Sequence, residues 1–250
     1  MACSKCGFIV DPFSPSCPRC DVERAITAGN MERVLRIIQA NPAVVTSKDL
    51  RGLTLLHLAV SRHLMALAQL LIDHYAIVDA VDDNRRTPLH RAVGKGSVEF
   101  THFLVKNGAN VNLRNNRGET PLHLAAAHDY QAITAFLLQH GAEVDARTNE
   151  GWTPLRLAAG EGHTEICRLL CKYGAAIDAP DEAGITPLSA AEKAFHVATA
   201  NVLRQQAEPA PEPEPEPTPE TTLVITPPAV PPPGAYELPP MEVPWDGWDE

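Results

Sequence analysis

The sequence predicts a mainly α-helical solenoid of stacked repeats, preceded by a short cysteine-rich module and followed by an acidic, proline-rich tail. The main evidence is a recurring phrase, Thr-Pro-Leu-His-Leu-Ala or a close variant, that begins at Thr54, Thr87, Thr120, Thr153 and Thr186. Each step between these phrases is 33 residues long. A fixed period in this range is typical of architectures in which each repeat packs on its neighbours.

The residue pattern of each repeat predicts two helices and a turn. The Thr hydroxyl can accept a hydrogen bond from an unpaired amide of the first helical turn. The Pro that follows has no amide to leave unpaired, and its φ is already helical. A second helix carries paired apolar residues such as Leu137 and Leu138, and it is expected to end at Gly108, Gly141 or Gly174. Glycine suits these ends because it adopts the left-handed conformation at little cost.

These repeats resemble the ankyrin repeat over residues 21–207. The resemblance implies a non-enzymatic array of antiparallel helix pairs with β-hairpin-like tips. His57, His90 and His123 hold the position at which ankyrin sequences place a structural histidine, and a unique catalytic site would not recur every 33 residues. The units expected are a degenerate first repeat at 21–53, repeats at 54–86, 87–119, 120–152 and 153–185, and a capping repeat at 186–207.

Two substitutions inside the array are expected to weaken one junction. Arg85 replaces the glycine found at the equivalent turn of other repeats, and Tyr75 replaces the glycine that ends the second helix. A left-handed residue other than glycine costs about 1 kcal/mol. The junction between residues 72 and 86 is therefore predicted to be the softest of the stack.

The charge of the chain is concentrated in its tail. The formal net charge is −10, and the segment Glu208–Glu250 carries ten acidic residues and no Lys or Arg, so residues 1–207 are balanced. The first residues lack the basic start and apolar core of a secretory signal. No run approaches the roughly 18 apolar residues of a membrane span. We expect a cytoplasmic protein, or a nuclear one if the source is a eukaryote, without a membrane partner.

Four cysteines near the start predict a metal site. Cys3, Cys6, Cys17 and Cys20 form two C-x2-C pairs separated by ten residues, a spacing similar to that of short zinc ribbons. Four thiolates are the ligand set of a structural Zn²⁺ site, with no coordination position left for catalysis. Residues 1–20 are therefore expected to form a zinc ribbon, although Asp21 replaces its second customary glycine. Two disulfides, unliganded thiols and iron–sulfur ligation are the alternatives.

The other two cysteines, Cys167 and Cys171, lie four residues apart on a predicted second helix. A second metal site or a redox pair would use this spacing. Small buried hydrophobes are the favoured interpretation, because unpaired cysteine is among the most buried residue types.

Nucleic-acid binding by the ribbon is disfavoured. Its basic residues are Lys5 and Arg19, and they are opposed by Asp11 and Asp21. This is a poor electrostatic footprint for phosphates. The favoured function is a protein-binding scaffold or adaptor. The alternative is a nucleic-acid-associated regulator whose ribbon contacts nucleic acid and whose repeats recruit protein.

The tail, residues 208–250, alternates Pro and Glu as far as Glu220 and is expected to be disordered. Tyr236, Trp245 and Trp248 occupy its last residues. An inert solubilising tail has no use for two tryptophans, whereas tryptophan is a strong interface anchor. A short protein-binding motif is therefore favoured over an inert tail.

In ankyrin proteins the hairpin tips and the inner face of the first helices contact partners. Trp152 is expected to be exposed there and to be the strongest single anchor. The alternative for the Arg and Lys side chains of this face is that they are solvated charges on polar turns. We also hypothesise that residues 236–250 occupy this face, in cis or on a second copy, and compete with a partner. Transferred position by position, the resemblance predicts a basic concave face made of Arg51, Arg62, Arg86, Lys95, Arg114, Arg117 and Arg147.

Overall fold

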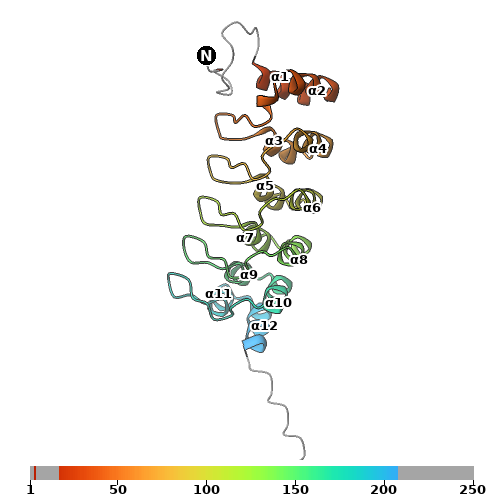
Figure 1. Ribbon diagram of the computed structural model, residues 1–250. Helices are drawn as coiled ribbons and strands as arrows, with labels where there is room; N and C mark the ends of the chain where they lie inside the picture. Colours follow the sequence, from red (N-terminus) through yellow and green to blue (C-terminus); the bar gives the residue numbers. More distant parts are fainter. Residues whose placement is uncertain (1–2, 4–16, 208–250) are drawn as a thin grey trace, which may run out of the picture. The chain divides into compact units, whose positions relative to one another are not determined.

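A computed structural model describes residues 3 and 17–207 as a stack of helix pairs (Figure 1). No helix in this described part is long and apolar enough to cross a membrane. The first helices of the pairs are α1 (Pro18–Thr27), α3 (Leu55–Ser61), α5 (Pro88–Gly94), α7 (Pro121–Ala127), α9 (Pro154–Glu161) and α11 (Pro187–Lys193). The second helices are α2 (Met31–Ala40), α4 (Met65–Asp73), α6 (Val98–Lys106), α8 (Gln131–Gln139), α10 (Thr164–Lys172) and α12 (Val197–Ala207), and a 3-10 turn, η1, spans Pro42–Val44.

The predicted helix starts are confirmed. Each of the five recurring threonines is the N-cap of its helix and has extended backbone geometry. At Thr87 the hydroxyl accepts a hydrogen bond from the amide of His90, and the His90 ring accepts one in return from the Thr87 amide. This reciprocal capping box satisfies two amides that a helix start leaves unpaired.

The predicted helix ends are also confirmed. Gly108, Gly141 and Gly174 follow their second helices with φ values of 86°, 80° and 84°. Tyr75 and Arg85, which replace glycine at equivalent places, adopt φ values of 62° and 56°. Both residues therefore hold the strained left-handed conformation that the repeat pattern requires, and the local softness predicted from them remains a prediction.

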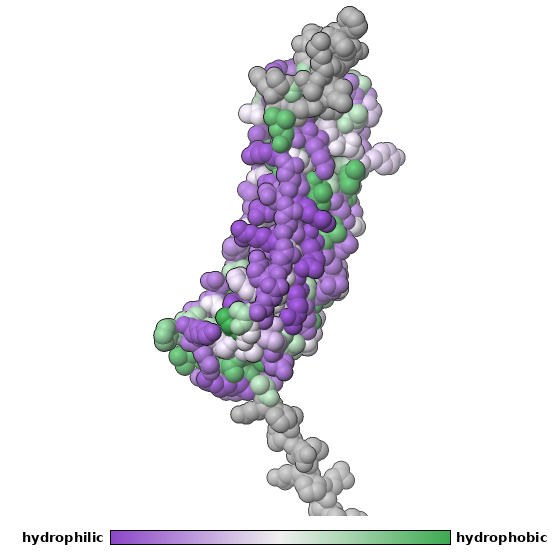
Figure 2. Space-filling view, turned by 90° about the vertical axis from the view of Figure 1, so that its left-hand side faces the viewer, coloured by the Kyte–Doolittle hydropathy of each residue, from purple (hydrophilic) through white to green (hydrophobic). Residues whose placement is uncertain are grey.

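Hairpins project from the stack on the side of the first helices (Figure 1). Each is closed by a backbone bond such as that from the Asp82 amide to the Arg86 carbonyl, at 3.0 Å. Consecutive hairpins are joined by single backbone bonds, for example from the Asn116 amide to the Asn84 carbonyl at 3.0 Å. Within residues 17–207 these bonds do not build a strand. A continuous strip of hydrophilic residues covers the hairpin edge (Figure 2).

One continuous core runs through the described repeats. Leu56, Leu89, Leu122 and Leu155 occupy the same repeat position, and each is completely buried. Consecutive first helices pack on one another, as α5 does on α7 and α7 on α9. Burial between repeats, rather than within one, therefore stabilises the array.

The two ends of the array differ. Helix α1 begins at Pro18, three residues ahead of the expected start of the first repeat, and it buries Val22 against the core. At the other end, Phe195 has a φ of 62° and is 88% exposed. At the equivalent Gly162, a Cβ would lie 2.6 Å from the His196 ring of the next repeat. Phe195 has no following repeat to meet, as expected for a cap, although His63 and Asp129 show that side chains also occur at this position inside the array.

Candidate functional site

Three adjoining hollows lie along the first helices in the N-terminal half of the array, and hairpin residues line the second and third of them. The first separates α1 from α3 and is lined by Cys20, Arg24 and Arg62, among others. The second, of about 380 Å³, lies beneath the first two hairpins and ends at Arg91. The third, of about 280 Å³, begins at Arg91 and extends to Leu124 on α7. Arg91 lines both the second and third hollows, and the neighbours Arg62 and Ser61 line the first and the second, so the three hollows together are called the groove.

The seven predicted cations are all exposed, but they divide into two groups. Arg51, Arg62, Arg86 and Lys95 line the hollows. The other three, Arg114, Arg117 and Arg147, lie on hairpins farther along the stack and line none of the three.

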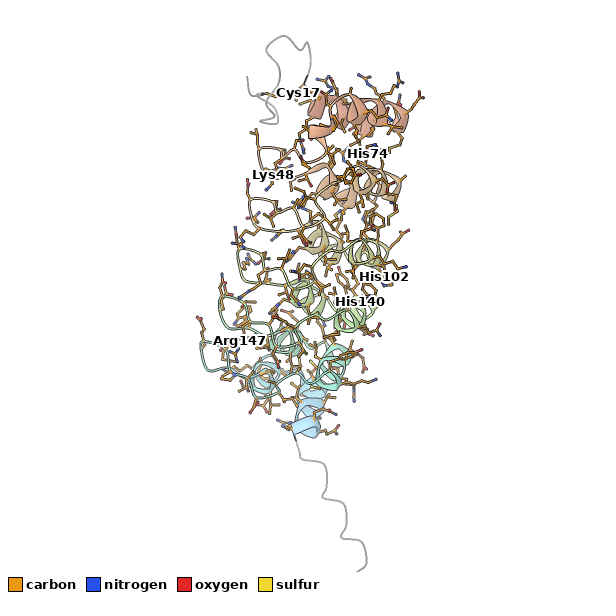
Figure 3. The ribbon with its side chains drawn as sticks, viewed as in Figure 1. Cys17, Lys48, His74, His102, His140 and Arg147 are labelled. Atoms are coloured by element: carbon orange, nitrogen blue, oxygen red, sulfur yellow. The ribbon has the colours of Figure 1, made fainter. Side chains whose placement is uncertain are left out.

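Two of these three cations, Arg114 and Arg147, make hydrogen bonds to the next hairpin. The Arg114 guanidinium donates to the Arg147 carbonyl, and the Arg147 guanidinium donates to the Pro180 carbonyl at 2.9 Å. Lys48, at the equivalent position of the first hairpin, reaches the Val81 carbonyl at 2.8 Å. Figure 3 shows Lys48 and Arg147 among the hairpins, on the side opposite the second helices. These side chains connect successive hairpins, so fewer of their donors are free for a partner than the sequence suggested. Among the cations that line the hollows, Arg62 donates to the Thr27 hydroxyl at 3.2 Å and Lys95 to the Ser61 carbonyl at 2.8 Å, whereas Arg51 and Arg86 make no such bond within the described residues.

Trp152 is half-buried, whereas the sequence predicted an exposed anchor. The Arg156 guanidinium lies 4.5 Å from its ring centroid in a cation–π contact, and it also pairs with Asp181 at 3.1 Å. Arg156 occupies the position that holds histidine in the three preceding repeats. The replacement of that histidine thus brings a long side chain over the indole and reduces its exposure.

Sequence reasoning missed the acceptor at the base of each hairpin, which is half-buried in the first hairpin and buried in the others. The Asp82 carboxylate accepts hydrogen bonds from the amides of Asn84 and Arg86 and pairs with Arg91 at 3.0 Å. Burial acts to raise the pKa of Asp82, but the backbone hydrogen bonds and the Arg91 charge outweigh it, and the pKa is lowered. The signal was a recurring polar residue every 33 positions: Asp49, Asp82, Asn115, Thr148 and Asp181.

The repeated histidines are structural, as the resemblance implies. The His57 Nδ1 accepts from the Thr54 amide, so its Nε2 carries the proton and donates to the Arg86 carbonyl at 2.9 Å. His90 and His123 make the equivalent contacts one and two repeats later. Burial lowers the pKa of His57 and of His123 to about 4 and also lowers that of His90. Both ring nitrogens of each histidine are engaged, which leaves none for acid–base catalysis.

Three of the four predicted metal ligands converge. The sulfurs of Cys3, Cys17 and Cys20 all lie within 4.8 Å of one another, and the Cys3 and Cys20 sulfurs are 3.7 Å apart. Two sulfurs bound to one tetrahedral zinc at about 2.3 Å each are separated by about 3.8 Å. The three described sulfurs therefore fit a tetrahedral metal site, and the fourth predicted ligand, Cys6, lies outside the described residues.

Arg19, one of the two basic residues counted for the ribbon, is buried. Its side chain is 1% exposed and belongs to the first turn of α1, between Cys17 and Cys20 in the sequence; Figure 3 labels Cys17, the N-cap of this helix. The guanidinium donates to the Ser47 hydroxyl at 3.0 Å and to the Leu53 carbonyl at 2.8 Å. It therefore fixes the loop leading into the next repeat and is withdrawn from any contact with phosphates.

Cys167 and Cys171 belong to the core, as predicted. Cys167 is fully buried and Cys171 packs against the same cluster. Burial raises the pKa of Cys167 to about 12 and raises that of Cys171. Neither thiol is therefore suited to bind a metal or to react at neutral pH.

Comparison with known proteins supports the repeat assignment. A family model described as "Ankyrin repeats (3 copies)" matches residues 23–115, 78–148, 96–183 and 143–211. These matches overlap and together span most of the chain. No curated protein matches the sequence. The predicted tail motif, Tyr236, Trp245 and Trp248, lies outside the residues that the structure describes.

Proposed function

Because the chain belongs to the ankyrin-repeat family, a family of protein–protein interaction modules, we propose that it is a non-enzymatic scaffold that binds a protein partner on its concave face. The observation that supports this proposal is the groove beneath the hairpins. Arg51 and Arg86 line the groove, and their guanidinium groups make no hydrogen bond or ion pair within the described residues. Exposed arginines without a structural role are available to a partner, and arginine is enriched at interface hot spots.

The cysteine cluster is proposed to hold a structural Zn²⁺. The three converging sulfurs support this assignment, and Cys6 would complete the set. Four thiolates leave no open position on the ion, so the metal would stabilise the N-terminal segment rather than act on a substrate. Such a short segment buries little surface, and metal binding would supply much of its folding free energy. A reducing cytoplasm is the compartment that keeps these thiols available.

A nucleic-acid-binding ribbon is the alternative function. The burial of Arg19 weakens it, because Lys5 is then the remaining basic residue of residues 1–20. Phosphate recognition depends on several cations and weakens steeply with salt. Oligonucleotide binding that falls steeply between low and physiological salt, and that is lost on chelation, would favour the alternative over the scaffold.

The acidic tail is proposed as a competitor of the partner. Residues 236–250 carry acidic and aromatic side chains, and the groove carries cations. A tethered segment acts at a high effective concentration, so a weak contact can compete with a free partner. A synthetic peptide of residues 236–250 should then reduce partner binding by a protein that lacks residues 208–250. No competition at low salt would contradict this proposal.

The scaffold proposal is tested by reversing charge on one face at a time. The concave variant carries Arg62→Glu and Lys95→Glu. The matched control carries Arg168→Glu and Lys172→Glu on α10, where both residues are exposed on the second-helix side. A partner that is recovered with the wild type and the control but lost with the concave variant supports the proposal. Equal recovery with all three proteins would contradict it.

A further inference from the structure

The cations of the groove recur in register with the repeats. Arg62 and Lys95 occupy the same repeat position and follow the last residues of α3 and α5 as their C-caps. His128 holds that position after α7. Neighbouring first helices pack directly on one another, and packed helices lie about 8–10 Å apart. One side of the groove therefore presents a polar, mostly cationic group about every 8–10 Å.

The opposite side of the groove is also cationic. Arg51 and Arg86 extend from the first and second hairpins and are exposed. Between the two sides lies a floor of small and apolar residues, among them Gly94 and Leu124. A Cβ built on Gly94 would meet nothing within 4 Å, so the floor is open there. A peptide backbone can approach such a surface closely.

The acidic groups of the groove do not cancel this charge. Asp82 is buried and already paired with Arg91, and Glu23 lies 3.4 Å from the buried Arg19. The three hollows are lined by six cations (Arg24, Arg51, Arg62, Arg86, Arg91 and Lys95) and three carboxylates (Glu23, Asp82 and Asp83).

The cations at the repeat position of Arg62 and Lys95 do not continue to the end of the stack. The position of Arg62 and Lys95 is held in α9 by Glu161, which is exposed. Glu150 and Glu182 are exposed on the last hairpins. On the first-helix side the basic region thus covers the junctions from α1 to α7, a length of about 30 Å at 8–10 Å per repeat, while exposed cations continue on the hairpins as far as Arg147.

We propose that the partner presents an acidic segment in the polyproline II conformation, with carboxylates at every third residue. This inference rests on the proposed concave-face function and names its ligand. A polyproline II helix has three residues per turn and rises about 3.1 Å per residue, so residues i, i+3 and i+6 point the same way about 9.3 Å apart. That interval matches the spacing of Arg62, Lys95 and His128. A β-strand cannot do this, because residues three apart point to opposite faces.

The test measures binding of three labelled peptides to the full chain by fluorescence anisotropy at low salt. The first peptide has Glu at every third position among prolines, the second has the same composition with its glutamates in one block, and the third has Lys in place of Glu. Each exposed ion pair is worth roughly two- to fivefold in affinity. We expect the spaced peptide to bind about tenfold more tightly than the blocked one, and the Lys peptide not to bind.

Matched variants assign the effect to the groove. In the double variant Arg62→Gln and Lys95→Gln, the affinity for the spaced peptide should fall to that for the blocked peptide. In the control variant Arg168→Gln and Lys172→Gln, the spaced peptide should still bind about tenfold more tightly than the blocked one. Equal binding of spaced and blocked peptides, or tighter binding of residues 236–250 than of the spaced peptide, would overturn the inference. The scaffold proposal would survive that result if a partner were still lost from the charge-reversed concave variant, so the two failures are distinguishable.

Discussion

Acidification should destabilise the array through its buried histidines. The pKa of His57 and of His123 is about 4 in the folded chain, because burial disfavours the charged ring. An exposed histidine has a pKa of about 6.5. The unfolded chain therefore binds protons that the folded chain excludes. The stabilisation is fully present above pH 6.5 and is lost as the pH falls from 6.5 towards 4.

The size of the effect follows from the same values. At pH 5.0 a shift from about 6.5 to about 4 costs about 2 kcal/mol per histidine, or about 4 kcal/mol for His57 and His123 together. His90 is shifted in the same direction and adds to the loss. Domains are stable by about 5–15 kcal/mol. Moving from pH 7.5 to pH 5.0 should thus remove a large part of the unfolding free energy.

His123→Gln isolates one of these contributions. Glutamine at this position can still accept the N-cap hydrogen bond in a capping box, and it does not titrate. It loses the hydrogen bond to the Trp152 carbonyl, so the variant should be about 1 kcal/mol less stable at pH 7.5. Its further loss on acidification should be smaller than that of the wild type by about 2 kcal/mol.

Urea unfolding followed by circular dichroism at pH 7.5 and 5.0 measures both quantities. The control is His128→Gln, since that side chain is exposed and makes no capping hydrogen bond. The control should lose as much stability on acidification as the wild type. The reasoning is refuted if His123→Gln and the wild type lose the same free energy between the two pH values.

Three other outcomes are expected. Arg85→Gly should raise the unfolding free energy by about 1 kcal/mol and slow amide exchange at residues 72–86; unchanged exchange would contradict the predicted soft junction. Arg19→Met should cost about 1–3 kcal/mol for each buried acceptor that it leaves unpaired, among them the Leu53 carbonyl, whereas the exposed Arg24→Met should cost under about 1 kcal/mol; equal effects would contradict the role given to Arg19. Reduced protein should carry one zinc per chain, and Cys167 should stay unreactive after chelation exposes the N-terminal thiols; absence of metal would remove the zinc assignment.

The helix boundaries of the array could be predicted because local chemistry determines them. The Thr-Pro start depends on one hydroxyl and one missing amide, and both lie within four residues of the helix they begin. The conformation of Tyr75 and Arg85 could be predicted for the same reason, since the repeat fixes which position must be left-handed. A period of 33 residues transfers each local rule to every copy.

The charges of the candidate site could be predicted only in part, because long side chains find partners in other repeats. Arg114 reaches the carbonyl of Arg147, 33 residues away, and Arg19 reaches the Leu53 carbonyl, 34 residues away. Neither contact has a local signature. The sequence therefore predicted which positions carry charge on the hairpin side. It could not show that the Arg147 side chain has a hydrogen-bond partner in the next hairpin while the Arg86 side chain has none within the described residues.

Helix α1 connects the cysteine cluster to the groove. Cys17 is its N-cap, while Cys20 lies in the first turn and lines the first hollow. Between them, Arg19 is bound to the loop that leads into the second repeat. Under the proposed zinc assignment, the metal would hold the first turn of α1 through Cys17 and Cys20. Its binding free energy would then stabilise the first repeat and, through Cys20 and Arg19, the end of the groove where the basic region begins.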